Sequence, residues 1–291
     1  MAPIHPPRRA GLRAEPPDIV ELRRLRHDQP ELSAAVDLQI ALASLQARVK
    51  ARLPMPWIDA DPEWLKGQHD EGRPLLRLED VRLSWTDVRL MVRQTADLLL
   101  RHQLIDTAIH ARFQAYARTS EPVEGLVAGW FNAKASPDRV TTRWWPDDLD
   151  EESADQVLTL ALRPFLERCA EIAQQRTDLS TWTRAYCPLC GGDPELAVLT
   201  RGGERLLICS RCGTRWAIDS TACPWCGNAD HQRLTTYVSQ DHHYRLVACD
   251  ACRRYVKAYD ARAATRPVMP SVDTIATLPL DAAAMQQGYT G

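Results

Sequence analysis

The chain has 291 residues, of which 45% are hydrophobic and 25% are charged, and its formal net charge is −2. This length allows one large domain or two ordinary ones, and the composition is that of a soluble globular protein. A balance this close to neutral gives no general reason to expect a nucleic-acid or anionic-membrane partner. The sequence also has no apolar run long enough to cross a bilayer, so we expect no membrane insertion.

Residues 1–29 are rich in proline and arginine, which predicts a poorly ordered start. Arg8-Arg9 resembles the opening of a twin-arginine export signal. Charged residues and prolines follow, however, where such a signal needs a continuous apolar stretch. We therefore expect a cytoplasmic protein.

Residues 30–180 are expected to form an all-helical domain, because apolar residues recur there at helical spacing. Ser84 and Asp87 make a capping-box pattern at the start of one of these helices. The proline-rich stretch 54–83 is expected to be irregular. With its own apolar stripes, the helical region should fold without the rest of the chain. The expected helices are 30–53, a stretch from Ser84 to Leu99, 106–118, 122–134 and a stretch from Ser153 to Ala173.

Cysteine usage changes abruptly after Trp182. The sequence holds nine cysteines, and the eight between positions 187 and 252 all lie in Cys-x-x-Cys pairs. Disulfides are rare in a reducing compartment, so paired cysteines indicate metal binding. A β-hairpin is expected between the two pairs of each half, so the order pair, hairpin, pair occurs twice as an internal repeat. The expected strands are 196–200, 205–208, 234–238 and 244–248.

Two such pairs, brought together by a hairpin, make the closed tetrahedral thiolate site of a zinc ribbon or rubredoxin-like module. The predicted modules span 181–220 and 221–260, and 261–291 forms a C-terminal tail. A glycine follows the second cysteine in three of the pairs and permits a positive φ there. The predicted metal ligands are Cys187, Cys190, Cys209 and Cys212 for one ion, and Cys223, Cys226, Cys249 and Cys252 for the other.

Several alternatives remain at this point. A Cys-x-x-Cys pair can serve as a dithiol redox centre, and the first pair can share its metal with the third pair instead of the second. Soft thiolate ligands suit zinc and iron alike, so the metal stays open between the two. Cys169 is interpreted as a buried apolar residue, and His242-His243 as a hairpin tip without a ligand role.

A shell of four cysteines leaves no position for water or substrate, which argues for structural metals and against an enzyme. We therefore assign no catalytic and no cofactor-binding residues. From 187 to 260 the chain has nine Arg/Lys and eight Asp/Glu. Two zinc ions, each held by four thiolates, would make this balance acidic, which disfavours nucleic acid and favours a protein partner.

The residues around the pairs resemble a known family. A helix with Leu162-Arg163-Pro164-Phe165-Leu166 leads to Cys187-Pro188-Leu189-Cys190-Gly191-Gly192-Asp193-Pro194. Leu207-Ile208-Cys209-Ser210-Arg211-Cys212-Gly213, the third pair, and Cys249-Asp250-Ala251-Cys252-Arg253-Arg254-Tyr255 follow. With the segment Asp273–Asp281, these motifs resemble the formate dehydrogenase accessory protein family (FdhE-type), over roughly 153–290.

This resemblance implies a cytoplasmic maturation factor, or assembly chaperone, that binds the catalytic subunit of respiratory formate dehydrogenase. It also implies a helical N-terminal domain with two rubredoxin-like modules. Iron would be the bound metal, and all eight paired cysteines would be its ligands. A rubredoxin-like electron carrier and a metal-ribbon nucleic-acid regulator are the alternative functions. For the contact with the client we single out four aromatic and arginine residues near the cysteine pairs, which are Arg215, Trp225, Arg253 and Tyr255.

Overall fold

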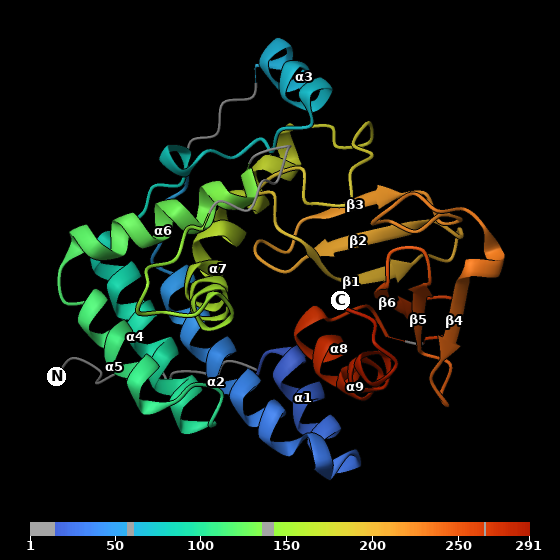
Figure 1. Cartoon of the computed structure of the whole chain (residues 1–291), viewed down its shortest axis with the longest axis horizontal. Coiled ribbons are helices and arrows are strands. Elements are labelled where there is room, and N and C mark those ends of the chain that lie inside the picture. The colour runs from blue at the N-terminus through green and yellow to red at the C-terminus, as the bar shows by residue number, and fades with distance from the viewer. Residues whose placement is uncertain (1–14, 57–60, 136–142, 265) are drawn as a thin grey trace, which may run out of the picture.

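The computed structural model describes residues 15–56, 61–135, 143–264 and 266–291. A helical region forms one side of the molecule and a single β-sheet forms the other, as Figure 1 shows. Within the described ranges, no helix is both long enough and apolar enough to cross a membrane. The helices are α1 (Pro17–Asp28), α2 (Ser33–Lys50), α3 (Pro62–Glu71), α4 (Trp85–Arg101), α5 (Thr107–Tyr116), α6 (Ser120–Ala135), α7 (Glu151–Arg176), α8 (Pro270–Ala276) and α9 (Leu278–Gln286).

Short polar side chains begin several of these helices. The Ser84 hydroxyl accepts a hydrogen bond from the Asp87 N–H at the start of α4, which is one half of the expected capping box. α7 begins earlier than expected, because Asp150 and not Ser153 caps it: the Asp150 carboxylate accepts from the Ser153 N–H at 2.7 Å. Pro164 lies inside α7, and the helix continues past it to Arg176.

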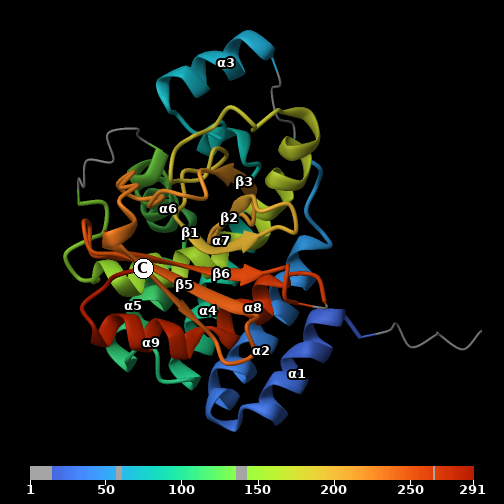
Figure 2. The ribbon, with the colours of Figure 1, turned by 90° about the vertical axis from the view of Figure 1, so that its right-hand side faces the viewer.

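The expectation of a poorly ordered start is wrong for its second half. Residues 1–14 lie outside the described residues, but Pro17–Asp28 forms α1, with Pro17 in the first turn, where its missing N–H costs nothing. Ile19 and Leu22 of α1 are buried against α2 and α8, in a cluster that includes Val272. Figure 2 shows α1 beside α8, although the two helices lie at opposite ends of the chain. Long-range packing therefore orders a segment whose local composition suggests disorder.

The stretch 54–83 also contains more structure than expected. α3 lies within it, capped by the Asp61 carboxylate, which accepts from the Trp64 N–H at 2.8 Å. A short 3-10 helix follows at Leu78–Asp80. Residues 57–60 of this stretch lie outside the described residues.

The six strands form one continuous sheet in the order β3-β2-β1-β6-β5-β4. Each module contributes three antiparallel strands, and β1 pairs with β6 in parallel to join the two modules. Both modules therefore lie in the same orientation along the sheet, as expected for a tandem repeat. The four hairpin strands were expected from the sequence, whereas β3 and β6 were not. The strands are β1 (Pro194–Leu199), β2 (Arg205–Cys209), β3 (Arg215–Ile218), β4 (Leu234–Val238), β5 (Tyr244–Cys249) and β6 (Arg254–Asp260).

The first module shares a core with the helical region. The cluster of buried residues that contains Trp130 and Phe165 also contains Cys187, Leu189 and Trp216. The backbone joins the two parts as well, since the Leu75 N–H donates to the Pro188 carbonyl at 2.8 Å. The expected independent core of the helical region is therefore not what the structure shows.

The C-terminal tail packs against the sheet through α8 and α9. The Tyr244 hydroxyl of β5 donates to Asp273 of α8 at 2.8 Å. The Tyr255 hydroxyl of β6 donates to Asp281 of α9 at 2.7 Å, and Lys257 forms an ion pair with the same carboxylate. These contacts attach both helices to the second module.

Candidate metal centre

The four Cys-x-x-Cys pairs adopt one local geometry. In each pair the residue after the second cysteine takes a left-handed conformation, with φ of 72°, 69° and 71° at Gly191, Gly213 and Gly227, and 57° at Arg253. Its N–H donates to the carbonyl of the first cysteine at 2.8–3.1 Å in all four pairs. The resulting tight turn directs both sulfurs of a pair to the same side, as expected at the three glycines. The fourth pair achieves the same turn with an arginine.

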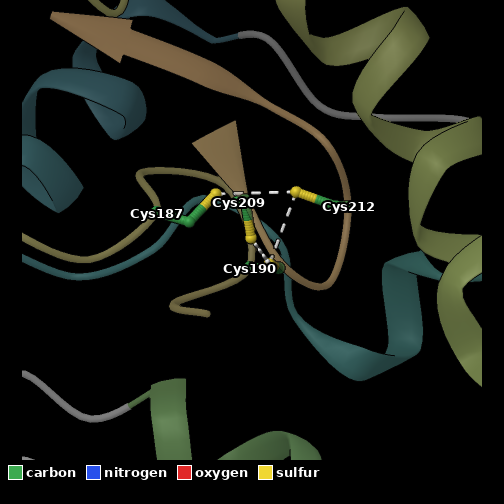
Figure 3. Close-up of side chains that lie close together, drawn as sticks. All are labelled: Cys187, Cys190, Cys209 and Cys212. Atoms are coloured by element: carbon green, nitrogen blue, oxygen red, sulfur yellow. Dashed lines mark hydrogen bonds between the residues drawn. The ribbon is translucent and has the colours of Figure 1, made fainter. Parts of the chain in front are cut away.

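The first cluster joins the first and second pairs. The sulfurs of Cys187 and Cys212 lie 3.5 Å apart, as do those of Cys190 and Cys209, and the Cys190 and Cys212 sulfurs are separated by 3.4 Å. Figure 3 shows the four side chains pointing toward one another. Two backbone N–H groups approach the thiols: Leu189 donates to Cys187 Sγ and Arg211 to Cys209 Sγ, each at 3.4 Å. The Thr214 hydroxyl lies 3.0 Å from Cys212 Sγ.

The second cluster joins the third and fourth pairs. The sulfurs of Cys223 and Cys252 lie 3.7 Å apart, as do those of Cys226 and Cys249. Within each cluster all four sulfurs lie within 4.8 Å of one another. The structure thus brings neighbouring pairs together, and the crossed arrangement of first pair with third pair does not occur.

These distances fit a tetrahedral metal site. Bonds of about 2.3 Å from a metal to four thiolates place the sulfurs about 3.8 Å apart, close to the observed separations. A disulfide would require about 2.0 Å. Two ions can therefore be held, one in each cluster, by the eight cysteines that the spacing singled out. Zinc and iron both suit this donor set.

Burial changes the pKa of several cluster thiols, although not all in one direction. Burial raises the pKa of Cys187 well above its usual value, and hydrogen bonds with the other cluster sulfurs raise it further. Burial also raises the pKa of Cys223 to about 12. Burial acts in the same direction on Cys249, but N–H groups of Cys252 and Ala251 outweigh it and lower the pKa of Cys249 to about 7. A bound divalent cation would supply the missing positive charge and keep all four sulfurs of a cluster ionised.

The two clusters differ in burial. All four cysteines of the first cluster are buried, with at most 2% of any of them exposed. In the second cluster Cys226 is exposed and Cys252 is partly exposed. The first cluster lies against the helical region, whereas the second is held by the sheet and its turns.

An arginine stacks on a tryptophan beside each cluster. Next to the first, Arg211 is 2% exposed, and its guanidinium carbon lies 3.5 Å from the centroid of the Trp130 ring. Next to the second, the guanidinium carbon of Arg254 lies 3.4 Å from the Trp225 ring centroid. Neither arginine was predicted from the sequence. Arg211 lies inside the second pair and Arg254 follows the fourth, so an arginine in or next to a cysteine pair was the available signal.

The four residues singled out for a client contact have different surroundings. Arg215 is exposed and Trp225 is partly buried. Tyr255 is 6% exposed and binds Asp281. The Arg253 guanidinium stacks on Tyr289 and donates to the Gln287 carbonyl at the end of α9. Tyr255 and Arg253 therefore attach the C-terminal helices, which leaves Arg215 and Trp225 as candidates for an external contact.

The remaining sequence candidates lie outside the clusters. Cys169 of α7 is buried, and burial raises its pKa to about 12, in agreement with an apolar packing role. His242 and His243 lie in the turn between β4 and β5, where His243 pairs with Asp241. Neither histidine belongs to a four-cysteine cluster.

The chain is similar to several proteins named FdhE, although no protein-family model matches it. It is 32% identical over 133 residues to the FdhE homolog of Aquifex aeolicus, covering 44% of this chain and 46% of that relative. It is 32% identical over 107 residues to the FdhE homolog of Shewanella oneidensis and 31% identical over 111 residues to FdhE of Escherichia coli O1:K1. These two matches cover 35% and 36% of this chain and 35% of each relative, so all three span less than half of the relative.

The crystal structure of the FdhE protein from Pseudomonas aeruginosa extends the likeness to most of the chain. It covers 94% of this chain and 90% of that one, with a TM-score of 0.61 and 23% sequence identity, which shows a shared fold. The likeness in sequence is therefore limited to part of each FdhE relative, and the likeness to the solved structure is one of fold. The FdhE-type fold agrees with the predicted helical region followed by a small sheet with two four-cysteine clusters.

Proposed function

We propose that this chain is a cytoplasmic accessory protein that assists the maturation of respiratory formate dehydrogenase by binding its catalytic subunit. The observation that carries the proposal is the pair of complete four-cysteine clusters within an FdhE-type fold. A metal held by four thiolates has no open position at which to activate water or substrate. The metals would then stabilise the sheet and the turns that present a recognition surface. We also propose that all eight clustered cysteines are the ligands.

The division into parts remains part of the proposal. We propose the parts that the sequence predicts, which are a helical region over 30–180, modules over 181–220 and 221–260, and a C-terminal segment over 261–291. The structure adds one relationship between them. The first module and the helical region act as one structural unit, because they share a core. The second module carries the exposed cluster and is the more independent part.

The test is capture of the client. Tagged protein, purified without air and loaded with both metals, is incubated with the immature catalytic subunit of formate dehydrogenase. We expect capture by the intact protein and weaker capture by Arg215→Ala, because Arg215 is an exposed cation next to the second cysteine pair. Arg48→Ala, which changes an exposed arginine of α2, is the matched control. No capture by any form would overturn the proposal.

A rubredoxin-like electron carrier is the second candidate, and the exposure of Cys226 favours it. Electron transfer needs a metal close to the surface, and the second cluster meets this requirement whereas the first does not. Metal analysis and a visible spectrum of protein prepared without air distinguish the two functions. An iron spectrum that bleaches and recovers reversibly would support the carrier, and a colourless zinc protein would exclude it.

A further inference from the structure

One side of α7 borders two hollows in the molecular surface. The first, of about 430 Å³, lies where the second half of α7 meets α2 and the start of α8. The second, of about 670 Å³, lies beside the first half of α7. The α7 residues that line them are three or four positions apart, so they share one face of the helix. They include Glu152, Asp155, Thr159, Arg163, Glu167 and Glu171.

The turn of the second cysteine pair lies beside both hollows. Ser210 lines the larger one and Gly213 lines the smaller one, so the hollows follow each other along α7 past a single tight turn. We call the two together the α7 groove, which is lined on the helix by residues within 151–174. At 1.5 Å per residue this part of the helix is about 35 Å long. That length matches about ten residues of extended chain.

The α7 groove is acidic. Three basic and six acidic side chains line it. The bases Lys50, Lys134 and Arg163 each form an ion pair with a carboxylate at 2.7–3.0 Å, so their charges are already neutralised. Glu151 and Glu152, at the start of α7, are exposed. A divalent metal held by four thiolates in the adjacent first cluster would add two negative charges. The field in the groove therefore favours a cationic ligand and disfavours an anionic one.

Side-chain amides offer hydrogen bonds to a main chain in the same groove. Gln46 Nε2 donates to the Leu160 carbonyl at 2.8 Å, and Gln174 Nε2 donates to the Ala170 carbonyl at 3.1 Å. These bonds orient the two amides, whose Oε1 atoms can accept from the N–H groups of a ligand. Ala47 of α2 also lines the groove, and its small side chain leaves room for a backbone. Length, charge and hydrogen-bonding groups together fit an extended polypeptide.

We propose that the α7 groove binds an extended, basic segment of the client polypeptide, whose lysine or arginine side chains lie against the carboxylates of the groove. This inference rests on the proposed function, because the segment belongs to the client. It adds where the client binds and which of its segments is recognised. The first metal cluster then has a second effect, since its negative charge and its second turn help to form the binding site.

Photocrosslinking from the metal-loaded, full-length chain locates the contact. Photoreactive benzoylphenylalanine is placed at Ala47, an exposed alanine of the groove, and in a matched control at Ala111, an exposed alanine of α5 outside it. The immature catalytic subunit is the probe. We expect crosslinks from position 47, mapped to a segment rich in lysine or arginine, and none from position 111. Capture of the client without crosslinks from position 47 would overturn this inference and leave the proposed function standing. Absence of capture would overturn both.

Neutral variants test the role of charge. Glu151→Gln/Glu152→Gln removes two carboxylates of the groove and should raise the dissociation constant for the client at least about fivefold at low salt. The difference should narrow as salt rises, because the attraction is electrostatic. Glu63→Gln/Glu121→Gln is the matched control, since it removes two exposed glutamates from the first turns of α3 and α6. Its dissociation constant should change less than about twofold. Equal losses in the two double variants would show that only net charge matters, and the inference would fail.

Discussion

The guanidinium carbon of Arg211 lies over the Trp130 ring, 3.5 Å from its centroid, and this contact connects the first metal cluster to the helical region. Arg211 belongs to the second cysteine pair, and Trp130 is a fully buried residue of α6. The same guanidinium donates to the Trp130 carbonyl at 3.4 Å and to Asp155 of α7 at 3.3 Å. One side chain therefore links a cysteine turn to two helices.

Replacing Arg211 should destabilise the folded protein. Arg211→Gln removes a buried cation that stacks on an aromatic ring and pairs with a carboxylate, which should lower the free energy of unfolding by about 2–4 kcal/mol. Arg254→Gln is the matched control, because Arg254 stacks on Trp225 beside the less buried cluster, and it should cost about 0.5–1 kcal/mol. Chemical denaturation of both variants with metals bound measures the difference. Equal losses would show that burial beside the first cluster has no special effect.

Two glycines provide a comparison of crowded and open turns. Gly191 and Gly227 occupy the same position in their pairs, with φ of 72° and 71°. A Cβ at Gly191 would lie 2.2 Å from the Lys134 carbonyl oxygen, whereas a Cβ at Gly227 would meet nothing within 4 Å. Gly227→Ala should therefore lower the free energy of unfolding only by the strain of a left-handed alanine, which is about 1–2 kcal/mol.

Gly191→Ala should add a steric clash to the same backbone strain. It should therefore lower the free energy of unfolding by more than about 3 kcal/mol. Thermal unfolding and metal content report both effects. A Gly191→Ala protein as stable as Gly227→Ala would mean that α6 does not lie against the first turn as the structure shows.

The two clusters should lose metal at different rates. The first cluster is reached only when the shared core opens, whereas Cys226 of the second is already exposed. A chromogenic chelator should release one equivalent at least about tenfold faster than the other. In Cys223→Ser/Cys226→Ser protein the fast phase should disappear and the slow phase should remain. A single phase in the wild-type protein would contradict the difference in burial.

Acid should weaken the ion pairs that Asp260 forms with Arg245 and Arg262. This carboxylate, 1% exposed, accepts from the Arg245 guanidinium at 2.5 Å and from Arg262 at 2.7 and 2.8 Å. The hydrogen bonds from Arg262 are the main cause that holds the pKa of Asp260 below its usual value. The stabilisation is therefore complete above the unfolded pKa of about 3.9 and is lost as pH falls through the lower folded pKa.

Asp260→Asn should accordingly lower the free energy of unfolding by about 2–3 kcal/mol at pH 7, with a difference that shrinks below about pH 4. Denaturation of both proteins between these pH values checks the trend. Asp241→Asn, at an exposed turn, is the control and should have a much smaller effect. A difference between wild type and Asp260→Asn that does not depend on pH would contradict the assigned ion pairs.

A shortened chain tests the shared core. A chain that ends at Asp178 keeps the helices α1–α7 but loses the residues of the first module, such as Leu189, that share a buried cluster with Trp130 and Phe165. We expect it to aggregate or to unfold without a cooperative transition. A chain that ends at Asp219, which keeps the first cluster and the strands β1–β3, should be better ordered. Cooperative unfolding of the shorter chain would show that the helical region has a sufficient core of its own.

The sequence alone predicted the tight turns of the three Cys-x-x-Cys pairs that are followed by glycine, and it favoured the grouping of neighbouring pairs over the crossed grouping. Two cysteines three positions apart, followed by a residue that can take a left-handed conformation, form a tight turn by local geometry alone. The hairpin between Cys190 and Cys209 is equally local, so its strands were predicted closely. The same local reasoning predicted α2, α4, α5, α6 and α7 from the spacing of their apolar residues, but it predicted none of α1, α3, α8 and α9.

Only the tertiary structure decided which cluster is buried and which is exposed. The two repeats have similar sequences, and their difference arises because α6 and α7 cover one of them. Long-range packing likewise ordered α1 against α8, joined β1 to β6, and placed Arg211 on Trp130. These contacts depend on surfaces far apart in the chain, and their free energy comes from burying those surfaces together, which no local pattern of residues records.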